Sequence, residues 1–276
     1  MKREIQLFPD IRLIYGTVPD IADENILEVS YCVKGVCEYR IGSGYYYLTN
    51  KSCMILRHDT KSECHASYSP NYCGISMLID SRCKSAGFAD ILDMLAVMKS
   101  IGAAEQCVLT SVEKIQKLFS DIYNESSDPK ASMLRIKTLE LLMLLSERKT
   151  VSREQQELIG RVGAFICRNV SDHYTISELS EMFRLNQTTL KELFRQTFGC
   201  PVYSSVKNRK MFRAAELIRT SDMRIIDIAE EVGYCNASKF SSAFREVMGV
   251  NPKYYQTEHK KFSLQYDRCI SENFAY

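Results

Sequence analysis

The sequence predicts an α+β chain with an N-terminal small β-barrel, a helical dimerisation segment, and then an all-α domain of two helix-turn-helix units joined by a long helix. Short runs rich in Tyr, Val, Ile and Cys fill the first part, helical spacing of apolar residues begins near Phe88, and one helix-turn-helix pattern occurs twice towards the end. We expect the barrel at 1–85, the helical segment at 86–148, a linker at 149–156, the two-unit domain at 157–260 and a tail at 261–276.

The composition indicates a soluble globular protein, since 45% of its 276 residues are hydrophobic and 25% are charged. No apolar run approaches the roughly 20 residues that span a bilayer, and the stretch from Met1 to Pro9 lacks the apolar region of a signal peptide. We therefore expect a cytoplasmic protein with no membrane partner. The 11 cysteines are irregularly spaced and include no Cys-x-x-Cys pair, which favours reduced, buried thiols over a disulfide framework or a zinc site.

Alternation of polar and apolar residues predicts a half-buried strand at 27–33, which ends in a turn at Gly35. Further strands are expected at 36–41, 45–48, 53–56 and 74–79. Short strands separated by turns in this way are typical of a small barrel or sandwich.

Helical spacing then takes over. The apolar positions are Ile91, Leu92, Leu95 and Met98, and then Ile115, Leu118, Phe119 and Ile122. A third helix at 133–147 carries leucines on more than one face, so it needs two partners. One partner is its own domain and the other is a second subunit, which predicts a homodimer.

Helix starts in the rear domain are marked by capping residues. Ser152 with Gln155, and Thr175 with Glu178, have the spacing of capping boxes, and Asn186 is placed to cap the next helix. The first of these boxes lies within the polar linker expected at 149–156.

The repeated pattern is a helix, a tight turn and a second helix. The copies run Ile176, Leu179, Leu190, Phe194, Gly199, Pro201 and Ile225, Ile228, Phe240, Phe244, Gly249, Pro252. At 100° per residue, the second helix of each copy has an apolar face and a polar face. The apolar faces are Leu190, Leu193, Phe194, Thr197 and Phe240, Ala243, Phe244, Val247; the polar faces are Thr188, Lys191, Glu192, Arg195 and Ser238, Ser241, Ser242, Arg245. A helix of this kind fits the major groove of DNA.

A basic excess accompanies the repeat. Residues 161–260 hold 15 Lys and Arg against 11 Asp and Glu. The joining helix, expected from about Pro201 to Arg219, contains Lys207, Arg209, Lys210 and Arg213, which predict a surface that faces phosphates.

These residues resemble the AraC/XylS-type DNA-binding domain between Thr175 and Tyr255, about a third of the chain. The matching positions are Leu179, Leu190, Phe194-Arg195, Phe198-Gly199, Pro201, Arg209, Ala214, Leu217, Ile225, Ile228-Ala229, Val232-Gly233-Tyr234, Ser238, Phe240, Phe244-Arg245, Gly249, Pro252 and Tyr255. The resemblance implies transcriptional control through double-stranded DNA, and a preceding cupin-like barrel that binds a small effector while helices dimerise. It also implies that bases are approached by Gln187, Thr188, Lys191 and Glu192 in the first unit and by Ala237, Ser238, Ser241 and Ser242 in the second.

The two units depart from the family pattern in different ways. Glu192 stands where relatives carry a cation, so it accepts a hydrogen bond from a cytosine amino group or repels phosphate. The second unit offers mainly serine, which cannot bond a base bidentately. We expect the first unit to supply most base discrimination and the second to act through phosphate contacts and DNA shape.

The front half offers weaker candidates. His58 and His65, with Glu63 between them, have the residue types of a cupin-type metal site but lack a close His-x-His pair, so solvated loop histidines are favoured. A redox pair of Cys64 and Cys73 is disfavoured because no cation flanks either thiol. The tyrosines at 45–47 line an effector pocket or pack in the sheet. No metal, cofactor or catalytic residue is predicted, and the effector-binding residues are not identified.

The leading interpretation is a dimeric, effector-responsive regulator and not an enzyme, which contacts RNA polymerase if it activates transcription. A second interpretation is a regulator controlled by a protein partner without a small ligand. A third, from another class, is a cupin-like metalloenzyme with a DNA-binding tail.

Overall fold

The computed structural model describes residues 3–19, 21, 23, 25–42, 44–58, 64–80, 82, 106–110, 113–125, 131–147, 152–170, 172 and 174–259. The strands are β1 (Arg3–Phe8), β2 (Ile11–Tyr15), β3 (Ile26–Lys34), β4 (Val36–Ile41), β5 (Gly44–Thr49), β6 (Ser52–Arg57), β7 (Cys64–Tyr68), β8 (Cys73–Asp80) and β9 (Gln106–Thr110). The helices are α2 (Glu113–Asn124), α3 (Ala131–Ser146), α4 (Arg153–Arg168), α5 (Ile176–Met182), α6 (Gln187–Phe198), α7 (Val202–Thr220), α8 (Ile225–Glu231) and α9 (Ala237–Met248), and 252–259 is also helical. The helix expected near 88–98 and the tail at 261–276 lie outside these residues.

The strands form two antiparallel sheets. One has the order β1-β2-β8-β3-β6-β9 and the other β5-β4-β7. β3 is the centre of the larger sheet, where Val29 pairs with Met77 of β8 and with Ile55 of β6. β9 pairs with β6 at the sheet edge, although it lies beyond residue 85, the predicted end of the front domain.

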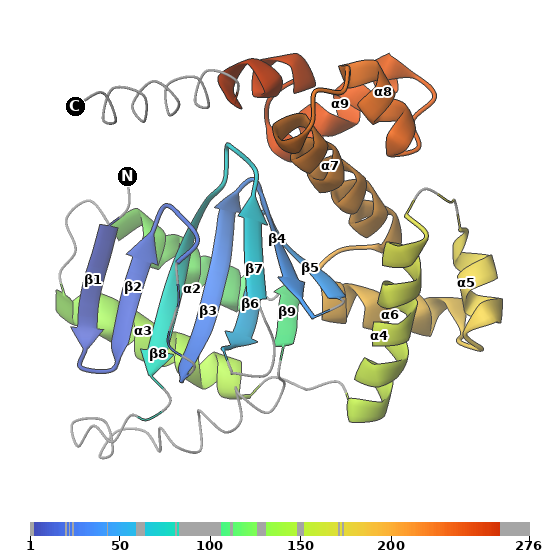
Figure 1. Cartoon of the computed structure of the whole chain (residues 1–276). Helices are drawn as coiled ribbons and strands as arrows, with labels where there is room; N and C mark the ends of the chain where they lie inside the picture. Colours follow the sequence, from blue (N-terminus) through green and yellow to red (C-terminus); the bar gives the residue numbers. More distant parts are fainter. Residues whose placement is uncertain are drawn as a thin grey trace, which may run out of the picture.

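The predicted closed barrel is corrected by this topology, because neither sheet closes on itself within the described chain. The β-rich front and helical rear are as predicted (Figure 1). Every residue of β3 from Ile26 to Cys32 is buried, since both faces of the strand are covered. One face packs on α2 and α3 and the other meets the smaller sheet, so β3 is enclosed and not half-exposed as its alternation predicted.

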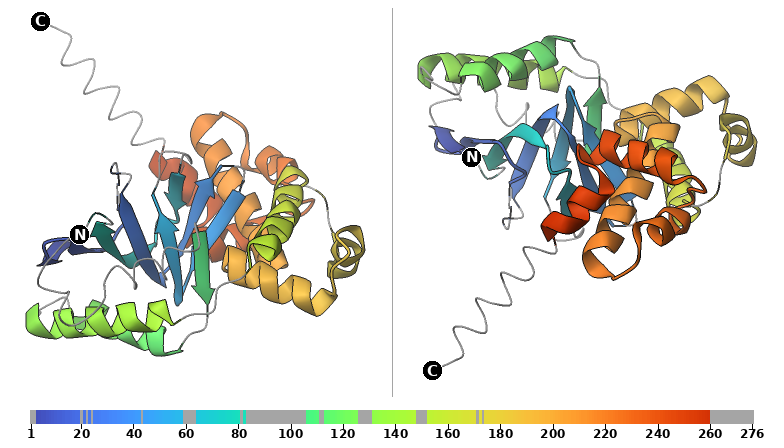
Figure 2. Two further views of the ribbon diagram at one scale, coloured as in Figure 1. Left: turned by 90° about the horizontal axis from the view of Figure 1, so that it is seen from below. Right: turned by 90° about the horizontal axis from the view of Figure 1, so that it is seen from above.

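The helices α2 and α3 cover one face of the larger sheet (Figure 2). The ring of Phe119 on α2 stacks on Tyr31 of β3, with 5.0 Å between centroids and 2° between planes. α3 buries the leucines at 134, 141, 142 and 145 against this core. Its opposite side leaves Met133, Ile136 and Met143 exposed by 44%, 59% and 49%, which confirms that α3 is apolar on two sides.

The helical rear part contains two apolar cores joined by α7. The first unit, α5 and α6, packs with α4 around Leu190, Phe194 and Phe198, and the second unit, α8 and α9, packs around Phe240 and Phe244. Both capping boxes, at Ser152 and Thr175, are present as predicted.

The second helices of the two units, α6 and α9, end in the same way. α6 stops at Gly199 and α9 at Gly249, with φ of 82° and 77° in the left-handed region that favours glycine. The repeat is therefore structural as well as sequential.

Two glycines of α4 give a matched stability test. A Cβ at Gly163 would lie 2.2 Å from Cζ of Phe198, whose ring is held by Phe194 and Tyr46, whereas a Cβ at Gly160 meets nothing within 4 Å. We expect Gly163→Ala to lower the free energy of unfolding by about 1–3 kcal/mol through overpacking. Gly160→Ala should raise it by about 0.5–1 kcal/mol through reduced backbone entropy. Urea denaturation measures both, and equal shifts of the same sign would contradict this packing.

Candidate nucleic-acid interface

The first candidate reading helix, α6, is held by its cap and its apolar face. Oδ1 of Asn186 accepts a hydrogen bond from the Thr188 backbone N–H at 2.8 Å, which starts the helix as predicted. Leu190, Leu193 and Phe194 are buried. The outward predicted residues are all exposed: Gln187, Thr188, Lys191, Glu192 and Arg195.

The second candidate reading helix, α9, is built in the same way. Asn236 caps it by accepting from the Lys239 N–H at 2.9 Å, and Phe240, Phe244 and Val247 are buried. Ala237, Ser238, Ser242 and Arg245 are exposed, and Ser241 is half-buried. Both predicted polar faces therefore reach the surface, while their contact with DNA stays a prediction.

The four cations predicted to face phosphates on α7 make contacts within the chain, and their contact with DNA stays a prediction. Lys207 pairs with Glu246 of α9, with 2.6 Å between Nζ and Oε1. Arg209 is directed at the front sheet, and Lys210 is only 2% exposed. Lys207 and Arg209 are each paired with a glutamate on another element, and Lys210 lies beside a cavity. Arg213, the fourth cation, is partly exposed and pairs with Glu216 of α7 itself.

The front sheet docks on α7 through the three consecutive tyrosines of β5. Tyr45 lies beneath the guanidinium of Arg209, 4.1 Å from ring centroid to Cζ. Tyr46 packs on Phe198 of the first unit, with ring centroids 5.3 Å apart. Tyr47 is fully buried in the apolar core of the second unit, beside Phe212. One strand therefore touches α7 and both helix-turn-helix cores.

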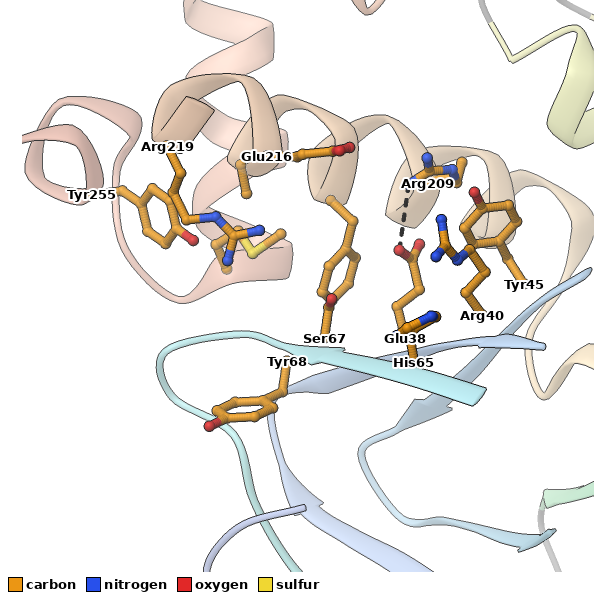
Figure 3. A pocket seen from close by; sticks show the side chains of 13 residues that line it. Glu38, Arg40, Tyr45, His65, Ser67, Tyr68, Arg209, Glu216, Arg219 and Tyr255 are labelled. Carbon is orange, nitrogen blue, oxygen red and sulfur yellow. Dashed lines mark hydrogen bonds and ion pairs between the residues drawn. The ribbon is translucent and has the colours of Figure 1, made fainter. Parts of the chain in front are cut away.

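A buried carboxylate completes this contact. Glu38 of β4 accepts a hydrogen bond from the Tyr47 hydroxyl at 2.8 Å through Oε2. Its Oε1 accepts one from Arg209 at 3.3 Å (Figure 3). Burial raises the Glu38 pKa to about 7, although Arg209 and the Tyr47 hydrogen bond act in the opposite direction. The free-energy cost of burying the charged carboxylate is therefore larger than the stabilisation that Arg209 and Tyr47 give it.

A cavity of about 250 Å³ opens beside this contact, between the smaller sheet and the helical part. Figure 3 shows Arg40 and His65 on the sheet side and Arg219 and Tyr255 on the helical side. Glu38 is paired with Arg209 and Glu216 is paired with Arg213 at 2.9 Å, so the wall carries an excess of cations. The sequence did not mark these residues as a set, because they come together only when the two parts pack.

The family comparison identifies the helical part. The family described as "Helix-turn-helix domain" matches residues 179–258, which covers both units. The chain carries a helix-turn-helix domain of the AraC/XylS type. The transcriptional regulator ExsA of Pseudomonas aeruginosa is 30% identical over 110 residues, which cover 40% of this chain and 38% of ExsA.

Two further proteins extend the comparison. The thermoregulatory protein LcrF of Yersinia pestis is 27% identical over 145 residues, covering 51% of this chain and 54% of LcrF. The matches to ExsA and LcrF therefore span about half of the length of those proteins or less. The structure of ToxT from Vibrio cholerae bound to (E)-4-(8-methylnaphthalen-1-yl)but-3-enoic acid is 14% identical, covers 94% of this chain and 97% of ToxT, and has a TM-score of 0.36.

The front-half candidates are not assembled into sites. His58 is not a solvated loop residue: its Nε2 lies 2.9 Å from Oε2 of the buried Glu28. His65 lies on β7 and lines the charged cavity, and Glu63 is outside the described residues. Within the described ranges, no group of three or more His, Cys, Asp and Glu is placed to hold a metal. No helix in the part of the chain that can be described is long and apolar enough to cross a membrane.

The two candidate redox cysteines lie on different sheets. Cys64 pairs in β7 with β4, and Cys73 pairs in β8 with β3. Burial raises the Cys64 pKa to about 11, and the Cys73 sulfur lies 2.9 Å from the Tyr123 hydroxyl. Both thiols are free, so the structure does not form this pair.

The Glu38 contact predicts a pH dependence of stability. Its pKa is about 7 in the folded chain against 4.5 for an ordinary glutamate, so the folded state binds the extra proton between these values. Stability supplied by this group is therefore fully present below about pH 4.5 and is lost as pH rises through 7, with a slope of at most about 1.4 kcal/mol per pH unit.

Glu38→Gln should remove that component, because an amide keeps an acceptor for Tyr47 without a buried charge. Urea denaturation of both proteins between pH 5 and 8 measures it as a difference. Parallel stability curves for the two proteins would contradict the assignment.

Proposed function

We propose that the chain is a sequence-specific DNA-binding transcriptional regulator, working in the cytoplasm on double-stranded DNA. The observation that carries this is the pair of matched reading helices, α6 and α9, each with a buried apolar face and an exposed polar face. They are joined by the 19 residues of α7, about 28 Å of helix. Successive major grooves on one side of DNA are about 34 Å apart, which is a separation of the same order.

The two units are proposed to contribute unequally. The exposed face of α6 includes Lys191, Glu192 and Gln187, whose long side chains reach base edges. The face of α9 offers Ser238 and Ser242 with Arg245 later in the helix, which suits phosphate contacts and reading of DNA shape. Discrimination is thus concentrated in α6.

We propose a homodimer formed through α3. The exposed side of this helix carries Met133, Ile136 and Met143, while its other side is already packed on the sheet. A second copy covers this apolar side with the same surface, as two-fold symmetry requires.

We also propose that a small effector bound by the front half changes how the DNA-binding units are presented. The physical route is the packing of β5 and Glu38 on α7, since a ligand can shift only an equilibrium between states that it binds differently.

A protein partner acting on the same contact is the second candidate. If the protein activates transcription, RNA polymerase is a further partner. A metal-dependent enzyme in the front half remains the alternative from another class, and metal analysis of the purified chain tests it.

The proposal is tested on duplexes that the purified protein enriches from genomic DNA. Lys191→Ala should weaken binding by about 1–3 kcal/mol and relax the base preference under the first unit. Ser242→Ala should cost less, because a single hydroxyl discriminates weakly. Arg245→Ala should weaken binding to all duplexes alike and reduce the salt slope by about one.

Fluorescence anisotropy at several salt concentrations gives these values. A protein that enriches no sequence would contradict the function. Equal losses of base preference in Lys191→Ala and Ser242→Ala would contradict the unequal roles.

The dimer has its own test. Ile136→Glu combined with Met143→Glu buries two carboxylates in the proposed interface and should yield a monomer, measured by sedimentation equilibrium. Ala131→Glu is the control, because it adds a carboxylate at the exposed start of α3, outside the proposed interface, and should leave the dimer intact. A wild-type monomer, or a dimer that survives the double substitution, would rule out this interface.

A further inference from the structure

Lys210 of α7 is a buried cation without a hydrogen-bonding partner. The residue is 2% exposed, and no described atom accepts a hydrogen bond from its Nζ. The ring of Tyr234 lies 5.7 Å from Nζ and gives a partial cation–π contact. Burial lowers the Lys210 pKa, against a smaller opposite effect of Asp172. A buried ammonium in these surroundings is costly unless an anion accompanies it.

Lys210 is one of the residues that line a cavity of about 570 Å³, a volume within the range that small-molecule sites occupy. It lies between the two helix-turn-helix units, which project from opposite ends of α7 (Figure 1). Its walls come from the end of α4, from α5, from α7 and from the turn before α9. Both units therefore contribute to one cavity.

The lining combines an apolar floor with an excess of positive charge. The apolar side chains are Ile166, Ile176, Leu179, Val202 and Val206. The charged ones are Lys207, Lys210, Lys239 and Asp172, of which Lys207 is paired with Glu246. A ligand that matches this lining has an apolar body and one anionic group.

We propose that this cavity binds a small organic acid, an aryl or acyl carboxylate, whose carboxylate accepts a hydrogen bond from Nζ of Lys210. Inorganic phosphate fits poorly because it has no body to cover the apolar floor. The carboxylate supplies the charge-assisted hydrogen bond that the described residues do not.

The acid would tie the two units together. Thr175 and Ile176 open α5, and Asn236 caps α9, and all three line the cavity. An occupant in contact with both walls fixes the separation of α6 and α9 and so alters joint affinity for DNA. This consequence rests on the proposed function, whereas binding of the acid does not.

The test uses the full chain and isothermal titration with two acids, 2-naphthoate and octanoate, each paired with its uncharged amide. At least one acid should bind at least tenfold more tightly than its amide. Lys210→Met keeps the apolar stem and removes the charge, so it should erase that difference while still binding the amide. Retained amide binding shows that the variant's cavity is intact. Lys253→Met, an exposed lysine on the last helix, is the control and should behave as wild type.

Three results would overturn the site. Neither acid binds better than its amide; or Lys210→Met binds the acid as wild type does; or Lys210→Met without any acid weakens DNA binding as much as Arg245→Ala, which would make Lys210 a phosphate contact. Acid binding that depends on Lys210 in a chain that binds no DNA would support the site and refute only the regulatory role.

Discussion

Three packing surfaces meet on α7, and this shared helix constrains the rest of the molecule. Val202 and Val206 face the core of the first unit, Met211 and Ala215 lie in the core of the second, and Arg209 meets the front sheet. The two units touch mainly through α7, and β5 holds that helix from the side. β5 also packs on α4 and α6 of the first unit. Because packed cores resist continuous deformation, we expect a shift of β5 to be transmitted to α7 and to the first unit together.

Two adjacent cations on α7 have different surroundings, and helix geometry explains the difference. Arg209 and Lys210 are about 100° apart on the helix, so they face different neighbours. Arg209 meets Glu38 and the ring of Tyr45, whereas Lys210 enters the gap between the units and finds only the ring of Tyr234. A planar guanidinium that stacks and forks suits the first position, and a flexible ammonium suits a site whose partner arrives from outside. The basic stretch therefore serves internal contacts before any contact with phosphate.

Local features of this fold were predictable from the sequence, and long-range ones were not. The caps at Ser152, Thr175 and Asn186 depend on residues two or three positions away, so spacing alone places them. The pairing of Glu38 with Arg209 joins residues 171 apart, and nothing in a count of charges shows which cation a distant carboxylate will neutralise. The sheet was misjudged for a similar reason: alternation predicts a strand but not the partners that bury both faces of β3 or add β9 at the edge.

The unequal chemistry of the reading helices makes their spacing more important than their individual strength. Under the proposed division of roles, a face of serines around Arg245 gains little from any one base, so the second unit contributes chiefly when the first has already placed it beside the DNA. Its contribution then depends on effective concentration, which is highest when α7 holds the units at the separation that the duplex presents. A contact that alters α7, whether at Glu38 or between the units, changes this effective concentration and leaves the contacts with bases as they are. In the proposed function, regulation through the separation of the units and recognition through α6 are thus separable in the same domain.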